Sequence, residues 1–119
     1  MDVTAEELAG RLEDEALTVL DVRSPGEYSG QTGYPCDPRQ GHLPGARNLD
    51  VQELLGRSPA EVRELVGLPE GAEIVCYCHS GQRSAMASEA LCAAGYDAKN
   101  YAGSWHEWSR HPELPGEGS

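Results

Sequence analysis

Short apolar runs alternate with capped, amphipathic segments along most of this chain. The clearest run, AEIVCY at 72–77, contains β-branched residues, and ALTVLDV at 16–22 has the same character and ends near Asp21. Runs of this length, bounded by polar turns, are typical of buried strands. Two shorter runs, ARNL at 46–49 and AKNY at 98–101, predict two further strands.

Helix start signals lie between the predicted strands. In a capping box, a Ser or Thr at the cap is followed three residues later by a Glu, and a glycine often ends the helix. Proline at the first helical position strengthens two of these signals. They predict a helix from Thr4 to about Glu13, helical turns from Ser24 and at 51–56, and helices at 58–67, 82–95 and 104–108, the last opened by a capping box at Ser104.

The alternation of strands and helices predicts an α/β domain with a mostly parallel sheet and helices on both faces. We expect one domain over residues 1–112, with a long Gly- and Pro-rich loop at about 29–44 and a disordered tail at 113–119. In such sheets, ligands bind beyond the carboxyl ends of the strands. Residues that directly follow a strand are therefore the first candidates for a site.

Composition limits the classes of partner. Hydrophobic residues make up 39% of the chain, enough for a core, and the formal net charge is −11. Nucleic-acid binders carry basic surfaces, so we expect no nucleic-acid partner. No run approaches the roughly 18 apolar residues of a membrane span, and the acidic N-terminus lacks the basic region of a signal peptide, which favours a cytoplasmic protein without membrane association. Because the net negative charge repels anions at long range, a site for an anion must be local, built from backbone amides and one or two arginines.

The segment CHSGQRS at 78–84 has this local character. Cys78 ends a strand and precedes a helix, where unpaired amides and the positive end of the helix dipole favour a thiolate. Gly81 permits a conformation in which successive N–H groups point inward, and Arg83 adds a positive charge. The same turn holds three neutral hydrogen-bond donors, Ser80, Gln82 and Ser84.

A buried structural cysteine before an ordinary helix is the simpler interpretation, but such a turn needs neither Gly81 nor Arg83. We therefore interpret residues 78–83, called the active loop below, as a holder for an anionic sulfur. Four residues separate Cys78 from Arg83, whereas cysteine phosphatases surround a phosphate with C-x5-R. A shorter loop encloses a smaller space, so the count favours sulfur transfer over phosphate hydrolysis or arsenate reduction.

Four segments carry recognisable motifs: VLDVRSPGEYSG at 19–30, GHLPGARNL at 41–49, VCYCHSGQRSAMA at 75–87 and YAGSWHEW at 101–108. In this order, and over about 3–112, they resemble the rhodanese (thiosulfate sulfurtransferase) family. The resemblance implies a five-stranded, mostly parallel sheet between helices and a six-residue loop that begins with the catalytic cysteine. That role falls on Cys78, and the substrate-binding loop is then His79, Ser80, Gly81, Gln82 and Arg83.

The segments GQTGYPCDPRQ at 30–40 and GSWHEW at 103–108 resemble the catalytic half of tandem thiosulfate sulfurtransferases. The active loop differs from the CGSGV type of mercaptopyruvate enzymes. Arg83 is its only permanent charge, whereas some thiosulfate enzymes carry two basic loop residues. Thiosulfate is the favoured donor.

The resemblance also implies a mechanism without a metal or organic cofactor. The Cys78 thiolate takes sulfur from a small anionic donor such as thiosulfate, and the persulfide passes it to cyanide, to a thiol or to a protein acceptor. Arg83 contacts the sulfonate oxygens of the donor or the loop itself. A second class remains open, a persulfide carrier or sensor that acts with a partner protein, and thiosulfate:cyanide turnover discriminates between the two.

Several residues around the loop have structural and functional interpretations. Asp21 and Arg23 end a strand at the same rim, and we interpret them as a structural charge pair that braces neighbouring loops. His42 is expected to have a structural hydrogen-bonding role, because thiolate attack on sulfur needs no proton relay. Trp105 stands three residues before Trp108, a spacing typical of the core or of a pocket wall.

The remaining cysteines do not have the spacing of a metal site. The chain has four cysteines and four histidines but no C-x2-C or H-x3-H pair, so no metal is predicted. Cys76 and Cys92 are interpreted as small core residues. Cys36 lies in the long loop, where it is a candidate to resolve the persulfide if the loop folds over.

Overall fold

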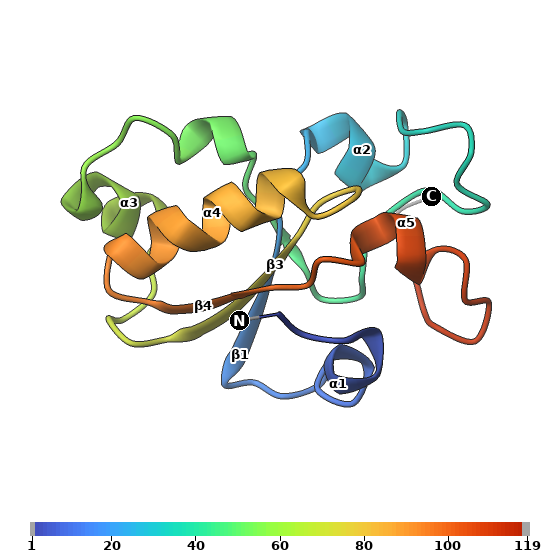
Figure 1. Ribbon diagram of the computed structural model, residues 1–119, viewed down its shortest axis with the longest axis horizontal. Coiled ribbons are helices and arrows are strands. Elements are labelled where there is room, and N and C mark those ends of the chain that lie inside the picture. Colours follow the sequence, from blue (N-terminus) through green and yellow to red (C-terminus); the bar gives the residue numbers. More distant parts are fainter. Residues whose placement is uncertain (1, 118–119) are drawn as a thin grey trace.

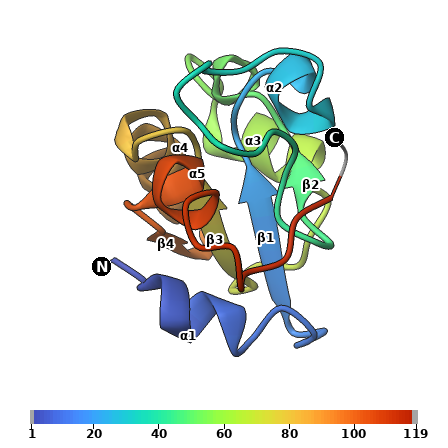
Figure 2. The same ribbon diagram turned by 90° about the vertical axis from the view of Figure 1, so that its right-hand side faces the viewer.

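A computed structural model describes residues 2–117, which form a parallel sheet with helices on both faces (Figure 1, Figure 2). The elements in chain order are α1 (Ala5–Ala9), β1 (Leu17–Asp21), α2 (Pro25–Ser29), β2 (Arg47–Asn48), the 3-10 helix η1 (Val51–Glu53), α3 (Pro59–Val66), β3 (Glu73–Tyr77), α4 (Gln82–Ala93), β4 (Asp97–Asn100) and α5 (Ser104–Trp108).

The sheet has the strand order β2-β1-β3-β4, and all neighbouring strands are parallel. The two central strands pair from Leu17 opposite Glu73 to Asp21 opposite Tyr77. Their carboxyl ends therefore meet at one edge of the sheet. Cys78 follows β3 directly at this edge, where ligands of parallel sheets bind.

Alternate strand residues face two separate cores, as expected for a sheet covered on both sides. Leu20 and Cys76 pack with side chains of η1, α3 and α4, whereas Val19 and Tyr77 pack with side chains of α1 and α5. Figure 1 shows α3 and α4 above the sheet and α1 below it. The predicted α/β architecture with helices on both faces is thus confirmed.

The prediction of five strands is wrong for the described residues, which form a sheet of four. The free edge of β4 carries a single parallel bridge, between Asp2 and Asn100, and the amide of Val3 donates to the Asn100 carbonyl at 2.9 Å. Thr4 then caps α1. The chain turns into the helix after one bridge, so no strand is propagated.

Capping boxes begin three helices as predicted, at Thr4, Ser24 and Ser58. The first helix is nevertheless shorter than expected, since α1 ends at Ala9 and not near Glu13. Gly10 follows as its C-cap, and glycine is a poor helix former.

The C-terminal segment at 113–117 makes specific contacts, although the sequence predicts a disordered tail from residue 113. The indole of Trp108 donates to the carbonyl of Pro115 at 2.7 Å, and Glu117 forms a two-way backbone bridge with His42 at 2.8 Å. Arg39, in the long loop, donates to four carbonyls of the C-terminal region, those of Trp108, Ser109, His111 and Leu114. Residues 118 and 119 lie outside the described residues. Within the described chain, the helices are all too short or too polar to cross a membrane.

Candidate active site

The Cys78 sulfur lies at the centre of the active loop and accepts several hydrogen bonds. The Gly81 amide and the Ser84 hydroxyl donate to Sγ at 3.1 and 3.4 Å, and the Ser104 hydroxyl, which donates its proton to the Tyr101 carbonyl, lies 3.9 Å from it. The residue as a whole is 1% exposed. The sulfur is therefore held at the base of the loop.

Two opposing influences set the pKa of Cys78. Burial raises it, but the Ser84 hydroxyl and the backbone amides of Ser84, Gly81 and Ser80 donate to the sulfur and together lower the pKa below its ordinary value. The arrangement favours the thiolate, which is the nucleophilic form of cysteine. Donors of the loop and the first turn of α4 supply this effect, as the sequence pattern at 78–84 predicts.

Bonds from the opposite side hold the carbonyls of the active loop away from the sulfur. The amides of Trp105 and His106, in the first turn of α5, each donate at 2.9 Å, to the carbonyls of Cys78 and His79. Asn100, at the end of β4, donates its side-chain amide to the carbonyl of Gly81 at 3.2 Å. With its carbonyls bonded outward, the loop can turn its N–H groups toward the sulfur.

Gly81 is required by two independent features of this loop. Its φ is +95°, in the left-handed region that glycine adopts without strain. A Cβ at this position would also lie 2.6 Å from the carbonyl oxygen of Ala102, which is a steric clash with backbone. The sequence identified Gly81 for its backbone freedom, but the close approach of residue 102 appears only in the fold.

Ser104 has a different role from the predicted one, because α5 has no capping box. Its hydroxyl accepts from the Cys78 amide at 3.1 Å and donates to the Tyr101 carbonyl at 2.9 Å. Glu107, the expected partner in the box, instead accepts from the Tyr101 hydroxyl at 2.6 Å. The prediction of a capping box at Ser104 is thus wrong, and no local sequence signal indicates its contact with the active loop.

Arg83 is turned toward α2 and forms a bidentate ion pair with Glu27. The two nitrogen–oxygen distances are 2.9 and 3.1 Å, and the Arg83 side chain is 30% exposed. Burial raises the pKa of Glu27, but the ion pair with Arg83 and bonds from Ser24 outweigh it and lower the pKa to about 2. In the sequence, Glu27 is recognisable only as a capping residue, because its partner Arg83 lies 56 positions away.

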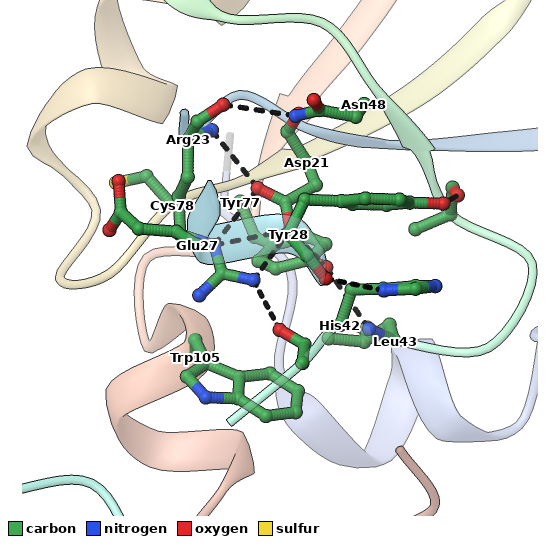
Figure 3. Close-up of polar contacts among 12 residues, drawn as sticks. Asp21, Arg23, Glu27, Tyr28, His42, Leu43, Asn48, Tyr77, Cys78 and Trp105 are labelled. Atoms are coloured by element: carbon green, nitrogen blue, oxygen red, sulfur yellow. Dashed lines mark hydrogen bonds and ion pairs between the residues drawn. The ribbon is translucent and has the colours of Figure 1, made fainter. Parts of the chain in front are cut away.

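Asp21 and Arg23 form a buried charge pair behind the loop, with Arg23 Nη2 2.7 Å from Asp21 Oδ2 (Figure 3). Arg23 also donates to the carbonyl of Gly41, and the Tyr77 hydroxyl donates to Asp21 at 2.8 Å. Burial raises the pKa of Tyr77 well above its ordinary value, so the phenol keeps its proton. The network joins β1, β3 and the long loop, which matches the bracing role favoured for this pair.

Trp105 is completely buried and belongs to the core. Its ring faces the Arg23 guanidinium, 5.3 Å from carbon to ring centroid, and its indole N–H donates to the Arg39 carbonyl at 2.9 Å. His42 stacks on Tyr28 with ring centroids 3.7 Å apart and bonds the Tyr28 carbonyl through Nδ1. Both side chains organise the scaffold of the site.

The other loop residues point in different directions. Ser80 and Gln82 are exposed at the surface of the loop. The His79 ring turns to the long loop, where it stacks on Tyr34 at 3.6 Å and its Nε2 lies 3.1 Å from Asp37 Oδ2. The structure therefore places Gly81 and Ser84 against the sulfur, and His79 and Arg83 against partners outside the loop.

The remaining thiols have distinct environments. Cys76 is fully buried in β3, as predicted, and burial raises the pKa of its thiol to about 12. Cys92 is exposed on α4, so its interpretation as a core residue is wrong. Cys36 is an exposed free thiol beside Asp37. At neutral pH, Cys76 is protonated and is not a candidate nucleophile.

Comparison with known proteins agrees with this geometry. The profile of the family described as "Rhodanese-like domain" matches residues 4–111. A thiosulfate sulfurtransferase of Pseudomonas aeruginosa is 36% identical over 96% of this chain and 45% of its own length. The sulfur carrier protein TtuD of Thermus thermophilus is 36% identical over 82% of this chain and 40% of its own length.

The fold agrees as well. A solved structure described as a probable thiosulfate sulfurtransferase superposes with a TM-score of 0.84 and 44% identity, and the match covers 98% of this chain and 47% of that one. The chain spans less than half the length of these relatives. By the extent of the family match and the identity to these relatives, the chain belongs to the rhodanese-like domain family.

Proposed function

We propose that this chain is a sulfurtransferase that carries sulfur on Cys78. The observation that carries the proposal is the Cys78 sulfur at the carboxyl end of β3, with the Gly81 amide 3.1 Å and the Ser84 hydroxyl 3.4 Å away. These donors favour an anionic sulfur, and the same donors can hold the outer sulfur of a persulfide. The thiosulfate sulfurtransferases among the relatives make thiosulfate the first donor to test.

The proposed reaction has two steps. The Cys78 thiolate attacks the outer sulfur of thiosulfate, the bond between the two thiosulfate sulfurs breaks, and sulfite leaves with the electron pair. The acceptor, cyanide or a thiolate, then attacks the outer sulfur of the persulfide, which releases thiocyanate or a new persulfide and restores the Cys78 thiolate. Neither step requires an external oxidant or reductant.

Arg83 is proposed to receive the donor anion while it stays paired with Glu27. A guanidinium has five N–H donors, and the ion pair uses one from each terminal nitrogen. The exposed part of the side chain offers the others to the sulfonate oxygens of thiosulfate. The chain as a whole is strongly acidic and repels anions. The positive charge of Arg83 offsets this repulsion at the site.

Intact mass measured with and without thiosulfate tests the proposal. We expect a gain of one sulfur atom, and peptide mapping should place it on Cys78. The Cys78→Ser variant should gain none, whereas the matched surface variant Cys92→Ser should gain one as the parent does. Sulfur found on a different cysteine, or no gain at all, contradicts the proposal.

A carrier role is the second candidate, because one relative is named a sulfur carrier protein. A carrier accepts sulfur as readily as an enzyme but releases it to a partner protein and not to a small acceptor. Cyanide added to the persulfide form decides between them. Rapid, repeated production of thiocyanate supports the enzyme, and a persulfide that survives in cyanide supports the carrier.

A further inference from the structure

Four potential metal ligands from three separate segments meet beside the active loop. They are Cys36 and Asp37 of the long loop, His79 of the active loop and His106 of α5, and their ligand atoms all lie within 4.8 Å of one another. The sequence carries no metal motif here, because the contributing segments are up to 70 residues apart and neither histidine pairs with a cysteine at the usual motif spacing.

Asp37 is the centre of this cluster, and its side chain is 1% exposed. His79 Nε2 lies 3.1 Å from Oδ2, His106 Nδ1 lies 3.7 Å from Oδ1, and Cys36 Sγ lies 3.9 Å from Oδ1. Ligands at about 2.0–2.3 Å from a tetrahedral ion are separated from one another by roughly 3.3–3.7 Å. These contacts reach both carboxylate oxygens of Asp37, and the four ligand atoms lie within 4.8 Å of one another, at most about 1 Å beyond the separations of a tetrahedral site. Side-chain movements of about this size would complete it.

The neighbours of the cluster orient its ligands. The His79 ring is held by stacking on Tyr34, with Nε2 toward Asp37, and the His79 and His106 rings meet edge to face at 5.3 Å. Arg110 donates to Asp37 Oδ1 at 2.9 Å and to the Cys36 carbonyl at 2.9 Å. Metal-ligating carboxylates are commonly hydrogen-bonded in turn. Arg110 contacts Oδ1, and the other oxygen, Oδ2, faces His79.

We propose that Cys36, Asp37, His79 and His106 form a binding site for a zinc ion. One thiolate, two imidazoles and one carboxylate are a donor set that suits Zn²⁺ and not the hard ions Mg²⁺ or Ca²⁺. Binding requires Cys36 to release its proton to the solvent. The ion would tie the long loop and α5 to His79, the residue that follows Cys78, so the site borders the sulfur-transfer loop without including its thiol.

The test uses the full chain, reduced and freed of metal with a chelator, and titrated with ZnCl₂ in a calorimeter. We expect one Zn²⁺ per chain, with no competition from excess MgCl₂. Cobalt gives a second readout, since tetrahedral Co²⁺ with a thiolate ligand shows visible ligand-field bands and a near-ultraviolet charge-transfer band. Because Asp37 is buried, the variants are made at the two exposed ligands.

Cys36→Ser and His106→Ala should each weaken Zn²⁺ binding by at least about tenfold, and Cys36→Ser should also remove the charge-transfer band of Co²⁺. His111→Ala and Cys92→Ser, at exposed positions outside the cluster, should bind as the parent does. Cys78→Ser should keep the full stoichiometry. The proposal is overturned if no saturable binding occurs, if the His106→Ala and Cys36→Ser variants bind normally, or if Cys78→Ser is the change that removes binding.

Discussion

Arg83 and Glu27 connect the active loop to the first turn of α2 through two parallel hydrogen bonds of 2.9 and 3.1 Å. Arg83 ends the loop that Cys78 begins, and the Cys78 amide is bonded to Ser104. Both ends of the loop are thus attached to other parts of the fold, which sets the size of the space around the sulfur.

Replacing Arg83 by Lys should raise KM for thiosulfate by about tenfold, with a smaller effect on kcat. A lysine supplies one point charge and cannot form the two parallel bonds to Glu27, so the position offered to the donor anion is lost. Steady-state thiosulfate:cyanide transfer measures the change. Arg57→Lys, in an exposed pair with Glu53, is the matched control and should leave KM unaltered. An unchanged KM in Arg83→Lys would remove Arg83 from the proposed donor site.

Glu27→Gln should make the free energy of unfolding less dependent on pH in acid. The pKa of Glu27 is lowered from 4.5 to about 2 in the folded chain, so the ion pair contributes fully above about pH 4.5 and is lost as the pH falls toward 2. Its contribution is roughly 2 kcal/mol. Glutamine can keep the capping box with Ser24, so the decrease in the free energy of unfolding measures the contribution of the ion pair.

Denaturant unfolding of the parent and of Glu27→Gln, at pH 7 and at steps below pH 4.5, gives the measurement. The parent should be the more stable at pH 7, and the difference should shrink as the pH is lowered. A difference that stays constant over this range would show that the substitution acts through packing.

The two cysteines of the segment CYC should respond in opposite ways to serine substitution. Cys78→Ser should abolish sulfur transfer and leave the unfolding transition nearly in place, because the serine oxygen, buried like the thiol, still meets the Gly81 amide and the Ser84 hydroxyl. Cys76→Ser should keep most of the activity and lose about 1–2 kcal/mol of stability, because a hydroxyl replaces a thiol in the core. Activity assays and thermal unfolding compare the pair. If Cys76→Ser were inactive but normally folded, the assignment of Cys78 as the nucleophile would be wrong.

Gly81→Ala should reduce both stability and sulfur transfer. The added Cβ meets the Ala102 carbonyl oxygen at 2.6 Å, and the residue must keep φ near +95°. Gly67→Ala is the matched control, since its φ is +73° but a Cβ there meets nothing within 4 Å. We expect a loss of about 1 kcal/mol at Gly67, from the backbone alone, and a larger loss at Gly81. Equal losses at the two positions would show that the contact with residue 102 relaxes at no cost.

One glycine inserted after Ser80 should impair sulfur transfer by widening the active loop to C-x5-R. The loop ends are held by Ser104 and Glu27, so the extra residue must bulge and withdraw amides from the sulfur. Binding of phosphate or vanadate to the lengthened loop, absent in the parent, would support loop size as the basis of selection. The interpretation of the C-x4-R spacing is refuted if the parent hydrolyses aryl phosphates efficiently or the lengthened loop transfers sulfur normally.

The sequence by itself determined the order of the helices and strands and the position of the active loop. Strand periodicity and the capping boxes at Thr4, Ser24 and Ser58 are local signals, since each depends on residues within a few positions of one another. The active loop was identified for the same reason. Its donors, Gly81 and Ser84, lie within six residues of Cys78.

Only the tertiary structure decided which distant groups meet these local features. Ser104 bonds the loop amide from 26 residues away, and Glu27 reaches Arg83 from 56 residues away. The segment at 113–117 is placed by bonds to Arg39 and His42, so its own composition could not predict its path. The local sequence around a side chain is the same whether or not a distant residue contacts it. Packing of the sheet against its two helical layers determines which distant residues meet, and a short window of sequence carries no information about that packing.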